Sequence, residues 1–439
     1  MTKRSILLFS AAVALVLSGA LALAFRPSVY PPYDEGRTYV DMAHGDYSHV
    51  YSYYSGRVLH PLAAGVLARV SHMRIDAALF IRLSMISLVG LFFLVAIEYA
   101  LDYRFAGALW LFVLVTATVV DAYRNYYWHD LFYAALCALF FLALRASPWL
   151  ALPVMFLLYM TRESTVVLVV ALVMVAAFRR RWGLCFAAAV VGFLAMRLDA
   201  ALVARSLPNN EGVSMPLLDF LRIPYNFMRN ICGVELWVNT IAATALPPIR
   251  TMAVPSWLHI GHIREVGYSG FYWEGPARTV LTFLTSFGIL PLLAVRGVCR
   301  SGWSVLRERL DIVTALVYGG LSFALAPLVG GQPERYILYA WPAFWLFGVG
   351  ALNDAFRSPQ KRIEILTLSL FVAWIPAMVR LVTGPPVRGP ESISNVTSWE
   401  MVVSLALAVA AYAGAWRILE PAQAELPAGD SPAVTSSAP

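Results

Sequence analysis

Charged side chains are scarce in this chain. They make up 13% of its 439 residues, against roughly 25% in an ordinary soluble domain. Apolar residues account for 60%, and the mean hydropathy is +0.68. A soluble fold of this length needs more polar surface than these residues provide. The composition therefore excludes a soluble enzyme and indicates a protein whose solvent is the lipid bilayer.

Lysine and cysteine are also nearly missing. Of the 33 basic residues only Lys3 and Lys361 are lysines, and no basic run suggests nucleic acid as a partner. The four cysteines are Cys137, Cys185, Cys232 and Cys299. Their scattered positions exclude a disulfide framework and a zinc knuckle.

Long uncharged runs are what the sequence has in abundance. A helix of about 20 residues crosses the hydrocarbon core, and we find twelve runs of this kind or somewhat shorter. They cover residues 5–25, 77–97, 105–121, 131–144, 147–161, 164–178, 183–203, 279–295, 312–331, 336–353, 363–384 and 399–416. The predicted fold class is an all-α polytopic membrane protein with about twelve transmembrane helices.

The distribution of arginine predicts the orientation. Lys3 and Arg4 precede the first run, which lacks a small-residue cleavage site, so we interpret it as a retained helix with a cytoplasmic N-terminus. Alternating from there places the arginine-rich short loops in the cytoplasm, as the positive-inside rule requires. We expect a multi-pass protein of the inner (cytoplasmic) cell membrane with both termini cytoplasmic.

The same alternation defines the domain organisation. Residues 1–418 form a single transmembrane domain, and two long loops, 26–76 and 204–278, lie outside and carry amphipathic helices. Residues 419–439 are rich in Pro, Ala and Ser and are predicted to be a disordered cytoplasmic tail. Because most of the loop length lies on the external face, we expect any chemistry to take place there.

Four consecutive runs between 105 and 178 are short, each with about 14–16 uncharged residues, or about 21–24 Å of helix. Snorkelling arginines or local thinning of the bilayer would accommodate this length. Alternatively, the polar residues at their external ends line one water-filled cavity. These residues are Asp121, Arg124, His129, Asp130, Arg162 and Glu163. Arg162 and Glu163 would equally fit an internal ion pair, and His129 a hydrogen-bonded interfacial histidine.

The first external loop is the most informative stretch. Asp34 stands at the N-cap of a helix predicted over Glu35 to His44, which Gly45 would close. Asp34 and Glu35 could simply stabilise the start of this helix. Their neighbourhood favours more, because sugars stack on aromatic faces and hydrogen-bond to carboxylates. Acceptor or sugar-binding candidates are Tyr39, Asp41, Arg57, His60, Asp130 and Glu163.

This layout resembles the type C glycosyltransferase superfamily of polytopic membrane enzymes, in particular the protein O-mannosyltransferase and lipid A aminoarabinose transferase branches. Asp34-Glu35 with Tyr39 is similar to the Asp-Glu and aromatic helix of their first external loop. The segment Gly56 to Pro61 is similar to the Arg/Lys-x-x-Pro segment that follows in many members. The second long loop has no counterpart that we can align.

The resemblance implies transfer of a sugar from a polyprenyl-phosphate carrier to an acceptor hydroxyl on a glycan, lipid or protein, with inversion. Asp34 would be the general base, with Glu35 beside it. Arg162, Arg335, Arg124 and His129 would bind the donor phosphate. No cofactor is implied with certainty, although Asp34, Glu35 and Asp130 offer the oxygen ligands that a divalent metal prefers.

Two other classes of function remain open. A transporter or flippase for a lipid-linked or anionic substrate would also need a charged cavity, but the two long loops do not form the matching halves typical of such folds. An oligosaccharide ligase or acyltransferase would share an external active site, and an acyltransferase would need a nucleophilic His or Ser centre. The seven histidines are too scattered to decide.

Overall fold

A computed structural model gives the arrangement of the chain. It describes residues 35–48, 50, 52–76, 78–87, 129–203, 216–238, 250–253, 265–296, 309–329, 336–340, 359–383 and 397–419, and the single positions 12 and 16. The sequence-predicted runs 5–25 and 105–121 and the tail 419–439 fall outside these residues, apart from those two positions and residue 419.

Helices dominate the described part of the chain. The labelled helices are α2 (Glu35–His44), α3 (Ser52–Ser55), α4 (Leu59–Ser71), α8 (Asp130–Ala146), α9 (Pro148–Tyr159), α10 (Thr165–Phe178), α11 (Trp182–Val203), α12 (Pro216–Asn230), α13 (Glu274–Thr285), α15 (Leu310–Val329), the 3₁₀ turn η2 (Leu338–Ala340), α18 (Pro359–Thr383) and α19 (Ser398–Leu419). Shorter helices cover Ala78–Ser87 and Leu290–Arg296. The all-α class is confirmed, with one small sheet as an exception.

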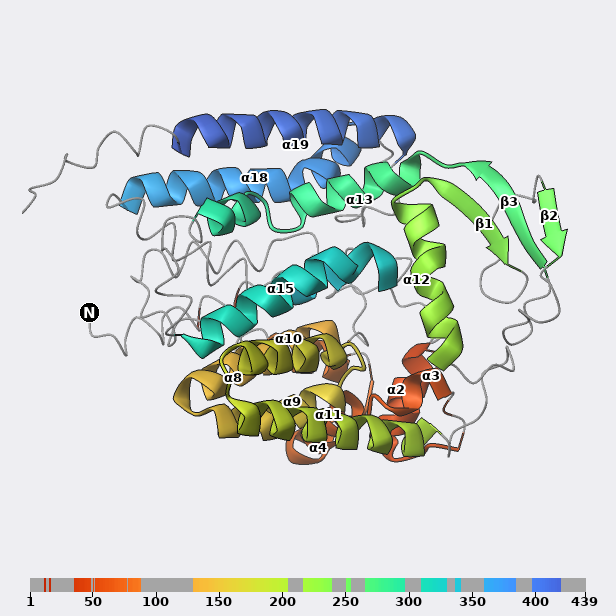
Figure 1. Ribbon diagram of the computed structural model, residues 1–439, viewed down its shortest axis with the longest axis vertical. Coiled ribbons are helices and arrows are strands. Elements are labelled where there is room, and N and C mark those ends of the chain that lie inside the picture. The colour runs from red at the N-terminus through yellow and green to blue at the C-terminus, as the bar shows by residue number, and fades with distance from the viewer. Residues whose placement is uncertain are drawn as a thin grey trace, which may run out of the picture.

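The helices form two groups with α15 between them (Figure 1). On one side α8, α9, α10 and α11 pack together with the short helices of the first predicted external loop. On the other side α13, α18 and α19 lie side by side. Helix α15 contacts α10 and α8 on one side and α12 on the other. The central position of α15 joins the two groups through one largely apolar core.

Four helices are long and apolar enough to cross a membrane, and a fifth span is present if a bent pair counts as one. The four are Trp182–Leu202, Leu310–Val329, Ile363–Arg380 and Ser398–Arg417; the pair Glu274–Thr285 and Leu290–Arg296 bends by 67°. Each overlaps a run expected from the sequence. Several long apolar helices indicate a multi-pass membrane protein, and the number of twelve spans stays a prediction.

The short runs are short helices in the structure as well. Helices α9 and α10 have 12 and 14 residues, which corresponds to about 18 and 21 Å of axial rise. The hydrocarbon core is roughly 30 Å thick. The turn that joins them, residues 160–164, buries the side chains of Thr161 and Arg162 within the helical bundle and leaves Glu163 partly exposed.

A three-stranded antiparallel sheet lies within the second predicted external loop, where only helices were expected. It consists of β1 (Val234–Val238), β2 (Arg250–Ala253) and β3 (Glu265–Phe271) in the order β1-β3-β2. Val234 pairs with Phe271 and Val238 with Val266, with one register shift between them. The sheet projects at one end of the molecule beyond α12 (Figure 1).

Helix α12 is the amphipathic helix expected in this loop, and it packs on α15. Asn226 and Asn230 donate side-chain hydrogen bonds to the carbonyls of Leu328 and Pro327, at 3.1 and 2.7 Å. These carbonyls belong to the last turn of α15, where no helical N–H remains to satisfy them. The contacts fix α12 across the end of the central helix.

The N-terminus of α19 is fixed by a buried carboxylate. Glu400 accepts hydrogen bonds from the backbone N–H and the hydroxyl of Thr397, at 2.8 and 2.7 Å. This is half of a capping box, since Glu400 is the third residue of the helix. Arg380 of α18 donates to the same carboxylate at 2.9 Å. A single acidic side chain thus caps one helix and holds the next.

The predicted helix Glu35 to His44 is confirmed with the same bounds as α2. It ends at Gly45, whose φ of +85° is the left-handed conformation that glycine adopts without strain. Helix α2 lies tightly against α4, because a Cβ added to Gly65 would come within 2.5 Å of the Ala43 carbonyl oxygen. The two helices share a small core of their own that includes Tyr39.

Candidate functional site

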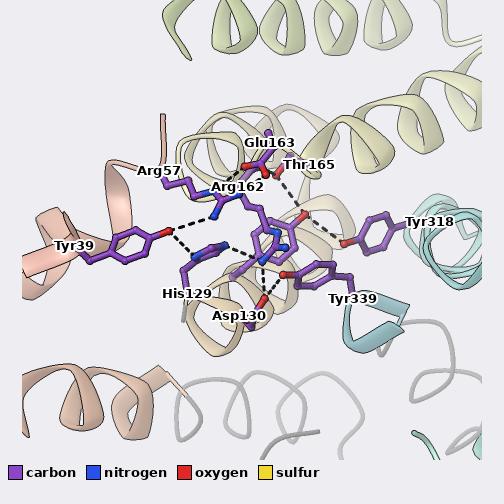
Figure 2. A network of polar contacts seen from close by, with 10 residues as sticks. Tyr39, Arg57, His129, Asp130, Arg162, Glu163, Thr165, Tyr318 and Tyr339 are labelled. Carbon is purple, nitrogen blue, oxygen red and sulfur yellow. Dashed lines mark hydrogen bonds and ion pairs between the residues drawn. The ribbon is translucent and has the colours of Figure 1, made fainter. Parts of the chain in front are cut away.

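The turn between α9 and α10 presents two adjacent charged residues to different partners (Figure 2). Arg162 pairs with Asp130 at the start of α8, with 2.7 Å between Nη1 and Oδ1, and both side chains are 2% exposed. Glu163 pairs instead with Arg57, from the segment before α4. The sequence left open an ion pair between Arg162 and Glu163 themselves; the structure assigns each of them another partner.

Aromatic rings enclose the buried pair. The guanidinium of Arg162 lies 5.0 Å from the ring centroid of Tyr336 and 4.9 Å from that of Tyr339, within the range of cation–π attraction. The Tyr339 hydroxyl donates a short hydrogen bond to Asp130 Oδ1, which also accepts from Arg162. Desolvation of the two charges is thereby offset by directed partners on several sides.

The second pair lies nearer the surface. Arg57 donates two parallel hydrogen bonds to Glu163, from Nε to Oε2 at 3.0 Å and from Nη2 to Oε1 at 2.5 Å. The Arg57 side chain is 4% exposed and that of Glu163 is 48% exposed. Burial raises the pKa of the Glu163 carboxyl, but the positive charges of Arg57 and then Arg162 have the larger combined effect and lower the pKa to about 2. Glu163 is therefore an ionised carboxylate that solvent can reach.

Tyr39 of α2 joins the two ion pairs. Its hydroxyl oxygen accepts from Arg57 Nη1 at 3.3 Å and lies 3.4 Å from His129 Nδ1. His129 Nε2 lies 2.8 Å from Arg162 Nη1. Because a guanidinium only donates, His129 Nε2 is the acceptor and Nδ1 carries the hydrogen. The polar network thus fixes the histidine tautomer and ties α2 to the ends of α8 and α9.

His60 lies beside this network without a hydrogen bond. Its side chain is 0% exposed, and both ring nitrogens lack a partner among the described residues. The ring packs 6.3 Å from His129 and 5.6 Å from Phe132, between centroids. Burial lowers the pKa of His60 to about 4, although the Asp130 carboxylate raises it. His60 is a neutral imidazole held next to charged groups.

The network continues into the helical bundle. The Thr165 hydroxyl donates to the Arg162 carbonyl at 2.8 Å, and its oxygen lies 3.3 Å from the Tyr133 hydroxyl. The Tyr133 hydroxyl lies 3.3 Å from that of Tyr318 on α15. A series of contacting side chains therefore connects the first predicted external loop with α15 (Figure 2).

The structure brings together seven of the twelve site residues named from the sequence: Tyr39, Arg57, His60, His129, Asp130, Arg162 and Glu163. Asp41 points elsewhere and pairs with Arg37 at 3.8 Å. Glu35 is the first residue of α2. Asp34, Arg124 and Arg335 lie outside the described residues, as does Asp121.

Several members of the network were not expected from the sequence. Thr165, Tyr133, Tyr318 and Tyr339 lie in or beside apolar runs, where tyrosine and threonine look like ordinary core residues. Asp199 was also missed. A Cβ added to Gly56 would come within 1.5 Å of the Asp199 Oδ1, so this carboxylate lies directly against the segment that carries Arg57. A single acid inside the run 183–203 was the available signal.

The charges of the network nearly balance. Arg57 is matched by Glu163 and Arg162 by Asp130, so neither guanidinium carries excess charge toward a further anion. Among the described residues, no three His, Cys, Asp or Glu side chains are placed to hold a metal ion. The arrangement is suited to orienting a neutral hydroxyl-rich ligand more than to binding an anion.

No protein-family model, curated protein or solved structure is similar enough to this chain to count as a match.

Proposed function

We propose that this protein is a membrane glycosyltransferase that moves a sugar from a polyprenyl-phosphate carrier to an acceptor hydroxyl. The observation that supports this best is the attachment of α2 to the charged network through Tyr39. Helix α2 begins at the residue after Asp34, the proposed base. The network therefore holds the helix that Asp34 directly precedes in sequence.

In the proposed reaction, the acceptor oxygen forms a bond to the anomeric carbon as the bond from that carbon to the carrier phosphate breaks. Asp34 takes the acceptor proton, which requires an approach of about 3 Å. The lipid phosphate leaves with the bonding electrons, and the configuration at the anomeric carbon inverts. Glu35 is the second acid of this pair. Inner-membrane localisation with external chemistry belongs to the same proposal.

The balance of charge refines the proposed donor site. Arg162 and Arg57 are already neutralised by Asp130 and Glu163. We therefore propose that Arg124 and Arg335 stabilise most of the charge that develops on the leaving phosphate. His129 and Arg162 would instead hold the ends of α8 and α9 in place. The half-exposed Glu163 carboxylate, with Tyr39 and His60 behind it, is the proposed contact for sugar hydroxyls.

The test is a transfer assay with the purified full-length protein and radiolabelled polyprenyl-phosphate sugars. Asp34→Asn is expected to lower turnover by about 10²–10⁴-fold, the usual contribution of a general base. Asp41→Asn is the matched control, because the Asp41 carboxylate of α2 pairs with the exposed Arg37 and not with the charged network.

Normal turnover by Asp34→Asn would contradict the base assignment. Movement of intact lipid-linked sugar across vesicles without any release or transfer of sugar would instead support a flippase and contradict the transferase.

A further inference from the structure

A second polar site lies at the other end of α4. There α2, α4 and the chain that follows enclose an open pocket of about 500 Å³. His60 is near the start of α4 and Arg69 in its last turn, which places the pocket about 13 Å along the helix axis from the network. The pocket is therefore separate from the site of the proposed transfer reaction.

The depth of the pocket comes from small residues. Ala43, Gly65 and Ala68 line its floor. Gly65 allows α2 and α4 to touch, since any side chain there would meet the Ala43 carbonyl oxygen. Ala68 is 7% exposed and Ala43 is 8% exposed. Backbone and methyl groups form a fixed floor that larger side chains would fill.

Three basic side chains line the same pocket. They are His44, at the end of α2, Arg69, and Arg74, which follows α4. His72 adopts a left-handed conformation with φ +52°, and the N–H of Met73 bonds to the Ala68 carbonyl at 3.1 Å. This C-terminal turn reverses the chain and brings Arg74 back over the end of the helix.

None of the three basic side chains forms an ion pair or hydrogen bond within the described part of the chain. The described acids of this region have other contacts: Asp41 pairs with Arg37, Asp46 accepts from Ser48 at 2.9 and 2.6 Å, and Asp76 accepts from the Leu79 N–H at 3.1 Å. The three basic side chains therefore line the pocket without an ion-pair partner among the described residues.

We propose that this pocket binds a phosphate group. Two guanidinium groups offer forked donors that match phosphate oxygens, and an imidazole adds a third donor. The methylene groups of Met73 and the side chain of Ile75 form an apolar wall beside them, while Arg82 Nη1 donates to Met73 Sδ at 2.7 Å. A phosphate linked to an apolar group suits this combination, so the source is either a lipid headgroup or a soluble phosphate.

Calorimetric titration of the full-length protein in a neutral detergent tests the proposal. One arm uses sodium phosphate, and the other uses dihexanoyl phosphatidic acid, which adds two short acyl chains to the same headgroup. Arg69→Gln and Arg74→Gln are each expected to weaken binding by about tenfold or more, as loss of a charge-assisted contact does. Arg37→Gln is the matched control: it removes an exposed arginine of α2 outside the pocket.

The two arms distinguish the sources. Similar affinity for sodium phosphate and for the lipid would show that the pocket binds a soluble phosphate. Binding of the lipid alone would show that the pocket binds a lipid headgroup. Either result supports the proposal. It is overturned if neither probe binds saturably, or if Arg37→Gln weakens binding as much as Arg74→Gln. Equal unfolding midpoints of all variants verify that the exposed substitutions leave the fold intact. Loss of transfer by Asp34→Asn has no bearing on either outcome.

Discussion

The network around Arg162 and the carboxylate of Glu400 are both buried ionic regions, but their hydrogen-bonding differs. Glu400 accepts from Thr397 and Arg380, and these bonds cap α19 and hold α18. Each region leaves one guanidinium nitrogen without a hydrogen-bond partner among the described residues, Nε of Arg380 and Nε of Arg162, but the network in addition leaves both ring nitrogens of His60 without one. Buried charge alone is thus weak evidence of function.

What distinguishes the network is the His60 imidazole, which has no hydrogen-bond partner among the described residues, and a position between the first predicted external loop and the bundle. The cap contacts with Thr397 and the ion pair with Arg380 give Glu400 a structural role. No cap or helix end requires His60 at its place, and an unpaired buried imidazole costs free energy. We therefore expect Glu400 to contribute to stability alone, and the network to contribute both to stability and to contact with a ligand. Three substitutions test this division, beginning with the one of largest expected effect.

Arg162→Met is expected to lower the free energy of unfolding by about 4 kcal/mol, because Asp130 would remain buried without its cation. Denaturant unfolding in detergent measures the loss. The double variant Arg162→Met with Asp130→Leu should recover at least half of it, since an apolar pair avoids the unpaired charge. A double variant as unstable as the single one would show that the hydrogen bonds to His129 and Tyr339 matter more than the ion pair.

Glu400→Gln is expected to lower the free energy of unfolding by about 2 kcal/mol, less than a fully buried pair would lose. Its partner Arg380 is 17% exposed and regains some solvation. Sugar transfer per folded molecule should stay unchanged, because this region lies far from the network in the fold. Reduced transfer by the correctly folded variant would remove the proposed distinction between the two regions.

His60 should make the stability depend on pH. Its pKa falls from 6.5 to about 4 on folding, so between these values the unfolded state binds a proton that the folded state does not. Stability is full above about pH 6.5 and decreases as the pH falls toward 4, by about 1 kcal/mol at pH 5.5.

His60→Phe should remove this part of the pH dependence while changing stability little at pH 7.5. Unfolding midpoints of both proteins between pH 7.5 and 5 measure the difference. An identical pH profile for the two proteins would mean that His60 is not held neutral in the folded protein. Glu163 contributes separately at lower pH, because its lowered pKa stabilises the fold only above the range where it is protonated.

Local signals predicted the helices well. The N-cap predicted at Asp34 and the terminator Gly45 indicated both ends of α2, and each long described helix overlaps an uncharged run of the sequence. These features depend on neighbours within a few positions. The strands β1 and β3 were missed because each is short and pairs with a segment about 30 residues away.

The sequence predicted which residues belong to the site better than it predicted which of them form ion pairs. The sequence gathered Asp130, Arg162 and Glu163 at one depth, because charges in short apolar helices must share a polar environment. It could not show that consecutive residues in a turn point in different directions. Nor could the sequence identify Tyr339, because a tyrosine in an apolar run looks like a core residue until the partner of its hydroxyl is known.

The spacing of the Asp130 partners has a consequence for biosynthesis. Arg162 follows Asp130 by 32 residues, whereas Tyr339 follows it by 209. At about 5–20 residues per second, the ribosome completes the last partner roughly 10–40 s after Asp130. The ion pair within the α8–α9 hairpin supplies charge neutrality during this interval. We therefore expect Asp130 to pair with Arg162 before the C-terminal half of the chain is synthesised, so that the Asp130 carboxylate does not face lipid unpaired.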